Sequence, residues 1–384
     1  MDVNKDVLTN LHKELLQGMY FDYDDTSTKF IDIITIMGSL FVYEPEIRKG
    51  NKGQTISIPV FNYFIWEKEQ TAVEELFGWV TDMPVSIQFT NMTPPNIEEG
   101  LILSLPALQD VALFYDDIES IAGVNDHHKN NSQITYDYIR LINKDNEKAK
   151  QQKLAAFLRK TISDSSEILV ANIKLLNKRK IKTTPSAILL VLTIAAAKSY
   201  FNGGVRVFYY HSKRIDTNMI NLAKASHPKT YQLLNALYQR ISLEMKIETP
   251  ILHKTRATII KEMPKEYKLQ IKHTNECLRM KRKTVLPAAV TTPCGICTAC
   301  LQRKIALAAA DSEVYDGFYQ YDYGQKVEEI TSEQDQQIYK DTLELIKSLY
   351  EELNNKKQFD EEYQHLGDDF LSAFDYFFNR YNPY

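Results

Sequence analysis

The chain has 384 residues, of which 44% are hydrophobic and 25% charged, as is ordinary for a globular protein of two or three domains. A formal net charge of −4 argues against a protein that coats nucleic acid, because such proteins carry an excess of basic residues. The N-terminus is polar and charged rather than signal-like, and the longest apolar run, residues 187–197, is too short to span a bilayer. We therefore expect a cytoplasmic protein without a membrane segment.

Residues 1–103 predict a small α+β domain. Its expected elements are a buried helix at 30–43, a strand at 55–64, a short helix at 72–79 and a half-buried strand at 85–89. Pro59 favours an edge position or a bulge for the first strand, because proline cannot donate to the ladder. Pro94 and Pro95 then interrupt the pattern and mark the end of the domain.

Residues 104–270 predict a second, α/β domain, because apolar strand-like and helix-like segments alternate there. Strands are expected at 110–114, 134–142, 167–175 and 205–210, and helices after the first strand through Gly123, at 149–161 and at 184–200. Such alternation indicates a Rossmann-like parallel sheet with helices on both faces. The polar residues 125–132 predict a loop whose two histidines face solvent rather than bind metal. Ligands of these sheets bind beyond the carboxyl ends of the strands, so the loop after Phe114 is the expected nucleotide site.

All four cysteines of the chain fall in residues 271–312, which we interpret as a zinc-knuckle subdomain. Cys294, Cys297 and Cys300 follow one another at two-residue gaps, and Cys277 precedes them. This spacing suits a tetrahedral four-thiolate site, and four protein ligands would make zinc structural rather than catalytic. Four ordinary buried cysteines, two disulfides and an iron–sulfur cluster are the alternatives.

Residues 313–384 predict a helical C-terminal region. A helix should follow Thr331, with Ile338, Leu345, Leu349 and Leu353 near one face. The strongly aromatic stretch 370–384 predicts a further helix, which either packs on its own domain or docks on a partner. We favour intramolecular packing.

The segment from Lys254 to Arg303 resembles the QueC family of 7-cyano-7-deazaguanine synthases, which are PP-loop ATP pyrophosphatases. The likeness rests on C-G-I-C-T-A-C-L-Q-R at 294–303 with Cys277 before it, on E-T-P-I-L-H-K-T-R at 248–256 and on H-P at 227–228. Residues 77–89 resemble the N-terminal extension of QueC-like proteins of bacterial antiphage operons, of the QatC and type IV CBASS types. The resemblance covers most of residues 30–310. It implies a PP-loop (HUP-type) fold and a zinc knuckle, and it places Lys254 and Arg256 near the substrate pocket.

The ATP loop of that family, SGGxDS, is not kept. The corresponding residues, which the resemblance places at the nucleotide site, are Tyr115, Asp116, Asp117, Glu119 and Ser120. Only the serine is retained, and two aspartates replace the glycines that would form an anion-binding nest. Like charges at close range repel by about 1–4 kcal/mol per pair, and a bridging magnesium ion would not restore the nest. The resemblance thus implies ATP and magnesium as cofactors, and the acidic loop argues against both.

A second motif differs as well. Defence-type relatives carry Glu-Asn-Gly after the fourth strand, where this chain has Y-Y-H-S-K at 209–213. The alternative explanation is a misaligned loop with a glycine-rich nest elsewhere. Asn202-Gly203-Gly204, however, precedes a strand and predicts a helix C-cap and turn.

Three hypotheses follow, and the sequence leaves open whether the chain is an enzyme. The first is a QueC-like subunit of an antiphage system that binds a partner protein of the same operon and has weak or no adenylation activity. The second is an active ATP-dependent ligase that converts a deazaguanine-type acid or conjugates it to a partner's N-terminus. The third is a zinc-stabilised nucleic-acid binder using the basic run from Arg279 to Lys283, which the acidic total disfavours.

Overall fold

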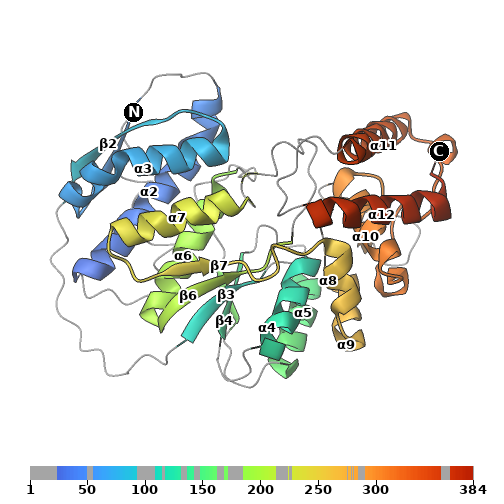
Figure 1. Ribbon diagram of the computed structural model, residues 1–384, viewed down its shortest axis with the longest axis horizontal. Coiled ribbons are helices and arrows are strands. Elements are labelled where there is room, and N and C mark those ends of the chain that lie inside the picture. Colours follow the sequence, from blue (N-terminus) through green and yellow to red (C-terminus); the bar gives the residue numbers. More distant parts are fainter. Residues whose placement is uncertain are drawn as a thin grey trace.

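A computed structural model gives the arrangement of the chain (Figure 1). The residues that it describes are 24–49, 55–92, 109–114, 117–130, 136–141, 148–161, 168–171, 185–212, 224, 227–274, 276–277, 279, 281–283, 290–355 and 364–383. Among the described helices, none combines the length and apolarity needed to cross a membrane.

A five-stranded, fully parallel sheet forms the centre of the fold. The parallel sheet was predicted with four strands, and its fifth strand was not expected. Its order is β5-β4-β3-β6-β7. The strands are β3 (Gln109–Leu113), β4 (Tyr136–Leu141), β5 (Ile168–Ala171), β6 (Gly203–Tyr209) and β7 (Lys246–Glu248). The chain moves outward from β3 in one direction through β4 and β5, and then crosses to β6 and β7 on the other side. The switch point therefore lies at β3, and the carboxyl end of this strand is where such sheets bind ligands.

Helices cover both faces of this sheet (Figure 1). Alternate residues of β3 show the division: Val111 and Leu113 join the core that contains α6 (Ala187–Phe201) and α7 (Pro228–Arg240). Ala112 and Phe114 join a second core with α4 (Ile118–Asn130), α5 (Lys148–Thr161), α8 (Arg256–Glu262), α9 (Lys265–Lys268) and the 3-10 turn η3 (Ile271–His273).

Helix α4 is longer than predicted. The expected polar loop at 125–132 is wrong for its first part, because α4 continues through Asn130. His127 is buried rather than solvated, and its ring lies edge-on to Phe208 at 4.5 Å between centroids. It follows Ile121 and Val124 at three-residue spacing, so it extends the buried face of the helix. Gly123 allows the close approach of this helix to the sheet, since a Cβ there would lie 2.1 Å from the Tyr210 ring.

The N-terminal part forms a βαβ unit. Strands β1 (Thr55–Val60) and β2 (Ser86–Asn91) pair in parallel, and α3 (Tyr63–Thr81) connects them beside α2 (Asp25–Arg48). The predicted strand at 55–64 ends four residues earlier than expected, and the helix predicted at 72–79 begins at Tyr63. This unit shares one hydrophobic core with α6, α7 and the central sheet, and α2 is buried on nearly all sides. The boundary at residue 103 stays a prediction.

A buried carboxylate, Asp32 of α2, fixes the turn that ends β1 and starts α3. Its oxygens accept hydrogen bonds from the backbone amides of Phe61 and Asn62 at 2.6 and 2.8 Å, and from the Trp66 indole at 2.9 Å. Burial raises the pKa of Asp32 to about 6, although these hydrogen bonds lower it. A long-range contact of this kind explains why the local pattern misplaced the strand end.

Asp32 should give the protein a measurable pH dependence. The native state keeps the Asp32 proton up to about pH 6, whereas the unfolded chain releases it near pH 4, so the free energy of unfolding should fall as pH rises between these values. The change attributable to Asp32 is on the order of 3 kcal/mol. Urea unfolding at several pH values should show this slope, and Asp32→Asn should remove it. Ser39→Ala, a neutral change in the same helix, should shift stability equally at every pH; an identical slope in Asp32→Asn would contradict the assignment.

The C-terminal third surrounds the cysteines. It contains the antiparallel hairpin of β8 (Lys281–Lys283) and β9 (Val290–Thr292), then α10 (Thr298–Ala309), and the 3-10 turns η4 (Glu313–Tyr315) and η5 (Val327–Glu329). Helices α11 (Glu333–Asn354) and α12 (Gln364–Tyr381) complete it. The N-cap of α11 is Ser332 rather than Thr331, and its buried face is Tyr339, Leu343, Ile346, Leu349 and Leu353, so Leu345 lies beside that face. Phe374 and Phe377 of α12 are buried against α10 and α11, which confirms intramolecular packing of the aromatic helix.

Candidate functional site

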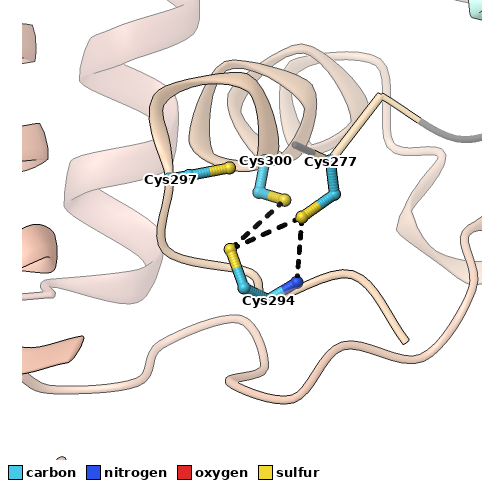
Figure 2. Close-up of side chains that lie close together, drawn as sticks. All are labelled: Cys277, Cys294, Cys297 and Cys300. Atoms are coloured by element: carbon cyan, nitrogen blue, oxygen red, sulfur yellow. Dashed lines mark hydrogen bonds between the residues drawn. The ribbon is translucent and has the colours of Figure 1, made fainter. Parts of the chain in front are cut away.

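The four cysteines converge, as predicted (Figure 2). Their sulfur atoms all lie within 4.8 Å of one another. The Cys277 and Cys294 sulfurs are 3.6 Å apart, and those of Cys294 and Cys300 are 3.9 Å apart. A tetrahedral zinc site with Zn–S bonds of about 2.3 Å requires sulfur separations of about 3.8 Å, so the donor set fits zinc. All four are free thiols, and the separations are far longer than a disulfide bond of about 2.05 Å. The cluster can therefore hold a metal ion such as zinc.

Local structure explains how these thiols meet. Cys277 and Cys294 flank the β8–β9 hairpin, Cys297 is the N-cap residue of α10, and Cys300 lies in its first turn. Gly295 adopts a φ of +83°, and a Cβ there would lie 2.0 Å from the Tyr321 carbonyl oxygen. Glycine is thus required for the turn between the second and third ligands.

Hydrogen bonds and a nearby cation favour negative charge at this cluster. The backbone amides of Arg279 and Cys294 donate to the Cys277 sulfur at 3.3 Å. The Cys277 thiol donates to Cys294, which lowers the pKa of Cys294 well below its usual range. Lys304 is buried in the same region and donates to the Tyr321 carbonyl oxygen at 2.7 Å. Burial lowers the pKa of Lys304 to about 8, against the attraction of Cys300. A four-thiolate site carries net negative charge after binding a divalent ion, and Lys304 offsets part of it.

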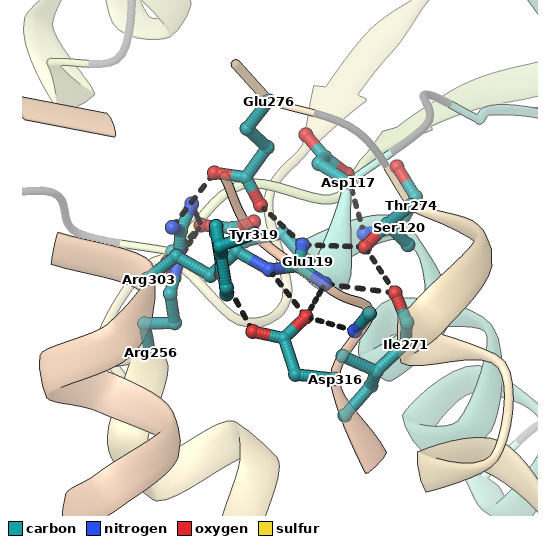
Figure 3. Close-up of polar contacts among 12 residues, drawn as sticks. Asp117, Glu119, Ser120, Arg256, Ile271, Thr274, Glu276, Arg303, Asp316 and Tyr319 are labelled. Carbon is teal, nitrogen blue, oxygen red and sulfur yellow. Dashed lines mark hydrogen bonds and ion pairs between the residues drawn. The ribbon is translucent and has the colours of Figure 1, made fainter. Parts of the chain in front are cut away.

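The start of α4, where the resemblance places the nucleotide, is occupied by the chain's own acids (Figure 3). Asp117 accepts a hydrogen bond from the backbone amide of Ser120 at 2.9 Å, in the manner of an N-cap. The amide groups at a helix N-terminus are the ones that bind phosphate in nucleotide sites. A carboxylate of the protein therefore binds one of these amides. Tyr115 and Asp116, the first two residues predicted for this site, lie outside the described residues.

Glu119 is fully buried and binds the arginine that was predicted to lie at the nucleotide pocket. Its Oε1 atom accepts from Arg256 Nε at 2.9 Å and from an Arg256 terminal nitrogen at 2.6 Å. The same oxygen accepts from the Ser212 hydroxyl at 2.8 Å. A carboxylate thus holds a guanidinium of the type that binds phosphate in two-point fashion.

The Glu119–Arg256 pair is one end of a buried chain of alternating charges that reaches the cysteine knuckle (Figure 3). Arg256 also contacts Glu276 at 2.7 Å, and Glu276 contacts Arg303 of α10 at 3.5 Å. Arg303 contacts Asp316 at 2.7 Å. Both arginines are about 6% exposed, so the chain lies in low dielectric where an uncompensated charge is costly.

The remaining predicted residues are placed as follows. Ser120 is buried, and Lys254 lies apart from the ion chain, with its Nζ 2.7 Å from Glu262 and 3.6 Å from Asp126. Arg279, the first residue of the basic run, lies 3.7 Å from Asp335 of α11 and so has an internal partner. His227 caps α7 by accepting the Lys229 amide, which is a structural role.

Sequence reasoning missed three participants in the ion chain: Ser212, Glu276 and Asp316. Ser212 falls in the segment read as a lost motif, and Glu276 directly precedes the first cysteine. Asp316 lies in an irregular loop with no periodic signal. The adjacency of Glu276 to Cys277 was the one clue that could have been used, because a metal ligand fixes the position of its neighbour.

The parallel sheet with its switch point at β3 and the thiol cluster downstream together define a Rossmann-like α/β protein with a metal-binding knuckle. A family model described as "Queuosine biosynthesis protein QueC" matches residues 125–311, just under half of the 384 residues. Over that stretch the chain is similar to the QueC family. The match includes all four cysteines and Arg256, and it begins five residues after Ser120, so the acidic loop lies outside it. No curated protein and no solved structure matches the chain.

Proposed function

We propose that this chain is a QueC-like component of a bacterial antiphage defence system that binds a partner protein of the same operon and has weak or no adenylation activity. One observation carries the loss of activity: Glu119, one methylene longer than the aspartate of the family loop, holds Arg256 inside the protein at 2.6–2.9 Å. The guanidinium that would meet a nucleotide phosphate already has a carboxylate partner, and a phosphate would have to displace it.

Asp117 supports the same conclusion from the backbone side. Its carboxylate binds the Ser120 amide at the N-terminus of α4. Triphosphate approaching this helix would meet the Asp117 carboxylate at close range, at a cost of about 1–4 kcal/mol. The fold and its metal knuckle are thus retained while the phosphate position carries negative charge. A scaffold role with partner binding accounts for that combination.

ATP binding should consequently be weak. We expect calorimetry with ATP and magnesium to show a dissociation constant above about 1 mM, with no release of AMP or pyrophosphate. The double variant Asp117→Gly, Glu119→Asp, which restores two residues of the family loop, should bind ATP at least tenfold more tightly because it removes one acid and shortens the other. Lys129→Gln, a change at the exposed end of the same helix, should match the wild type. Micromolar binding by the wild type with AMP formation would refute the proposed loss of activity.

The family match favours a second candidate, an active ATP-dependent ligase for a deazaguanine-type acid, because QueC proteins are described by a biosynthetic role. Co-expression with the neighbouring genes and mass spectrometry of the products separates the two candidates. A mass increase at a partner's N-terminus would support the ligase, whereas an unmodified partner that co-purifies with this chain would support the scaffold.

A further inference from the structure

Helices α5 and α9 together carry a concentration of positive charge. Helix α5 contains five Lys or Arg residues and no acid among its 14 residues. Residues 265–273, which include α9 and η3, contain three lysines and a single acid, Glu266. The whole chain has more acids than Lys and Arg residues, 50 against 46, so this concentration is local. The net charge of −4 argues against a surface that is basic throughout, but it does not exclude a basic region on one side.

The two segments lie side by side (Figure 1). The rings of Phe157 in α5 and Tyr267 in α9 meet edge to face, with 5.2 Å between their centroids. Leu154 and Leu158 of α5 share a buried core with Ile271 of η3. Because these apolar side chains face inward, the charged side chains are left on the solvent side. We define the α5–α9 basic face as Lys153, Arg159, Lys160, Lys265, Lys268 and Lys272, of which all but the half-buried Lys268 are exposed.

The charges of the α5–α9 basic face have no acidic partners in the described part of the chain. None of its six residues forms an ion pair there. Lys254 of the preceding segment shows the contrast, because its Nζ lies 2.7 Å from Glu262. Burial lowers the pKa of Lys268, and no acid offsets this effect. Unpaired cations that are held close together repel one another and attract a ligand that carries several negative charges.

The composition of this face favours a nucleic acid duplex over a protein partner. The centre of a protein interface is rich in apolar and aromatic residues, and lysine is depleted there. Among the described residues of α5, α9 and η3, the one large apolar side chain that is clearly exposed is Leu269, at 42%. Proteins that bind single strands stack the bases on exposed rings, whereas Phe157 and Tyr267 pack on each other. Lysine and arginine side chains alone bind backbone phosphates without reading bases.

We propose that the α5–α9 basic face binds double-stranded nucleic acid through its phosphate backbone, without sequence preference. Each lysine or arginine binds a phosphate oxygen and displaces a condensed counterion. The proposal goes beyond the proposed function because it requires neither adenylation nor a partner protein. It uses neither the thiol cluster nor the residues at the start of α4.

Fluorescence anisotropy of the full-length, zinc-loaded protein tests this face, with labelled DNA and RNA duplexes of about 20 base pairs as probes. At least one duplex should bind with a dissociation constant below about 10 µM at about 50 mM salt. If four phosphates are contacted, binding should weaken about 100-fold at about 200 mM salt, because the logarithmic slope is about −0.9 per phosphate. The double variant Lys160→Gln, Lys265→Gln should weaken binding at least about tenfold and make this slope shallower by about two units. A second duplex of unrelated sequence should bind within about twofold of the first.

The matched control is Lys68→Gln, Lys347→Gln, which changes the net charge equally through exposed lysines of α3 and α11. This variant should bind the duplex as the wild type does. All four side chains are exposed, so unchanged melting temperatures will show that both double variants fold. Equal losses of binding in the two double variants would overturn the proposal, because a general charge effect would then explain them.

Three other outcomes would also overturn it. The first is no binding of either duplex at about 100 µM protein and about 50 mM salt. The second is a loss of binding in Arg282→Gln, Lys283→Gln but not in Lys160→Gln, Lys265→Gln, which would place the nucleic acid at the β8–β9 hairpin. The third is binding to vesicles of phosphatidylserine and phosphatidylcholine but to neither duplex, which would identify a membrane-binding surface instead. None of these outcomes bears on the ATP experiment, so the two proposals fail independently.

Discussion

Replacing Cys294 by serine should release the bound metal and lower the melting temperature by more than about 10 °C. Structural zinc sites contribute about 10–16 kcal/mol of binding free energy. The melting temperature of a protein of this length shifts by about 1.2 °C per kcal/mol, so losing most of that binding free energy lowers it by more than about 10 °C. The effect should be large here because Cys277, Cys294 and Cys300 belong to the core cluster that also contains Tyr339 of α11 and Phe374 of α12. Loss of the metal from the knuckle should therefore destabilise the whole C-terminal third of the chain.

Metal analysis by mass spectrometry and thermal melting measure this result. The wild type should contain one zinc ion per chain, and the serine variant none. Thr298→Ser changes a residue between two ligands without removing a thiol, and it should keep both the metal and the melting temperature. A wild type that contains iron with visible absorbance would identify the cluster alternative instead. A metal-free wild type with the same melting temperature as the serine variant would contradict the metal site altogether.

Arg303→Met should destabilise the protein by about 3–5 kcal/mol, because it leaves the buried carboxylate of Asp316 without its cation. Glu276 keeps its contact with Arg256. Burial raises the pKa of Asp316, but Arg303 outweighs it and holds that pKa below its ordinary value. A lowered native pKa adds stability above about pH 4 that is lost as pH falls, so the variant should lose less stability on acidification than the wild type.

Urea unfolding at neutral pH and well below pH 4, at about pH 2, measures both effects. Arg380→Met is the matched control, since Arg380 contacts Asp311 and Glu313 but is 46% exposed, and exposed pairs contribute under about 1 kcal/mol. Adding Asp316→Asn to Arg303→Met should recover part of the stability by removing a stranded charge. A loss for Arg303→Met no larger than for Arg380→Met would show that the ion chain contributes little.

The parallel sheet was predictable because its strands are short apolar runs separated by helical periods, and that pattern depends on local sequence. The ends of the strands and helices could not be predicted where a residue distant in sequence determines them. Asp32 binds the Phe61 amide at the end of β1 although it lies 29 residues earlier in the sequence. No feature of residues 55–64 indicates this contact. His127 was misread for a related reason: an amphipathic ring among polar residues looks solvated until Phe208 is placed beside it.

The two candidate sites also differ in how far the sequence alone could predict them. The thiol cluster was predictable because its ligands are few, chemically distinct and close in sequence. The ion chain joins residues 119, 256, 276, 303 and 316, which come from five separate segments. Charged residues are common, so their pairing emerges only when the fold brings them together. Glu119 was seen as an odd replacement in a loop, but its attachment to Arg256 could not be read from either residue alone.

The shared core of the N-terminal unit has a consequence for how such a gene can change. Phe30 and Leu40 of α2 pack with Leu192 of α6 in one continuous interior, and Glu44 accepts the Ser186 amide at the start of α6 at 3.1 Å. If the gene were split between α2 and α6, each of the two products would expose apolar side chains that are buried in the intact protein. Neither product would be expected to fold alone. Lineages that carry this architecture should therefore inherit or lose both parts together.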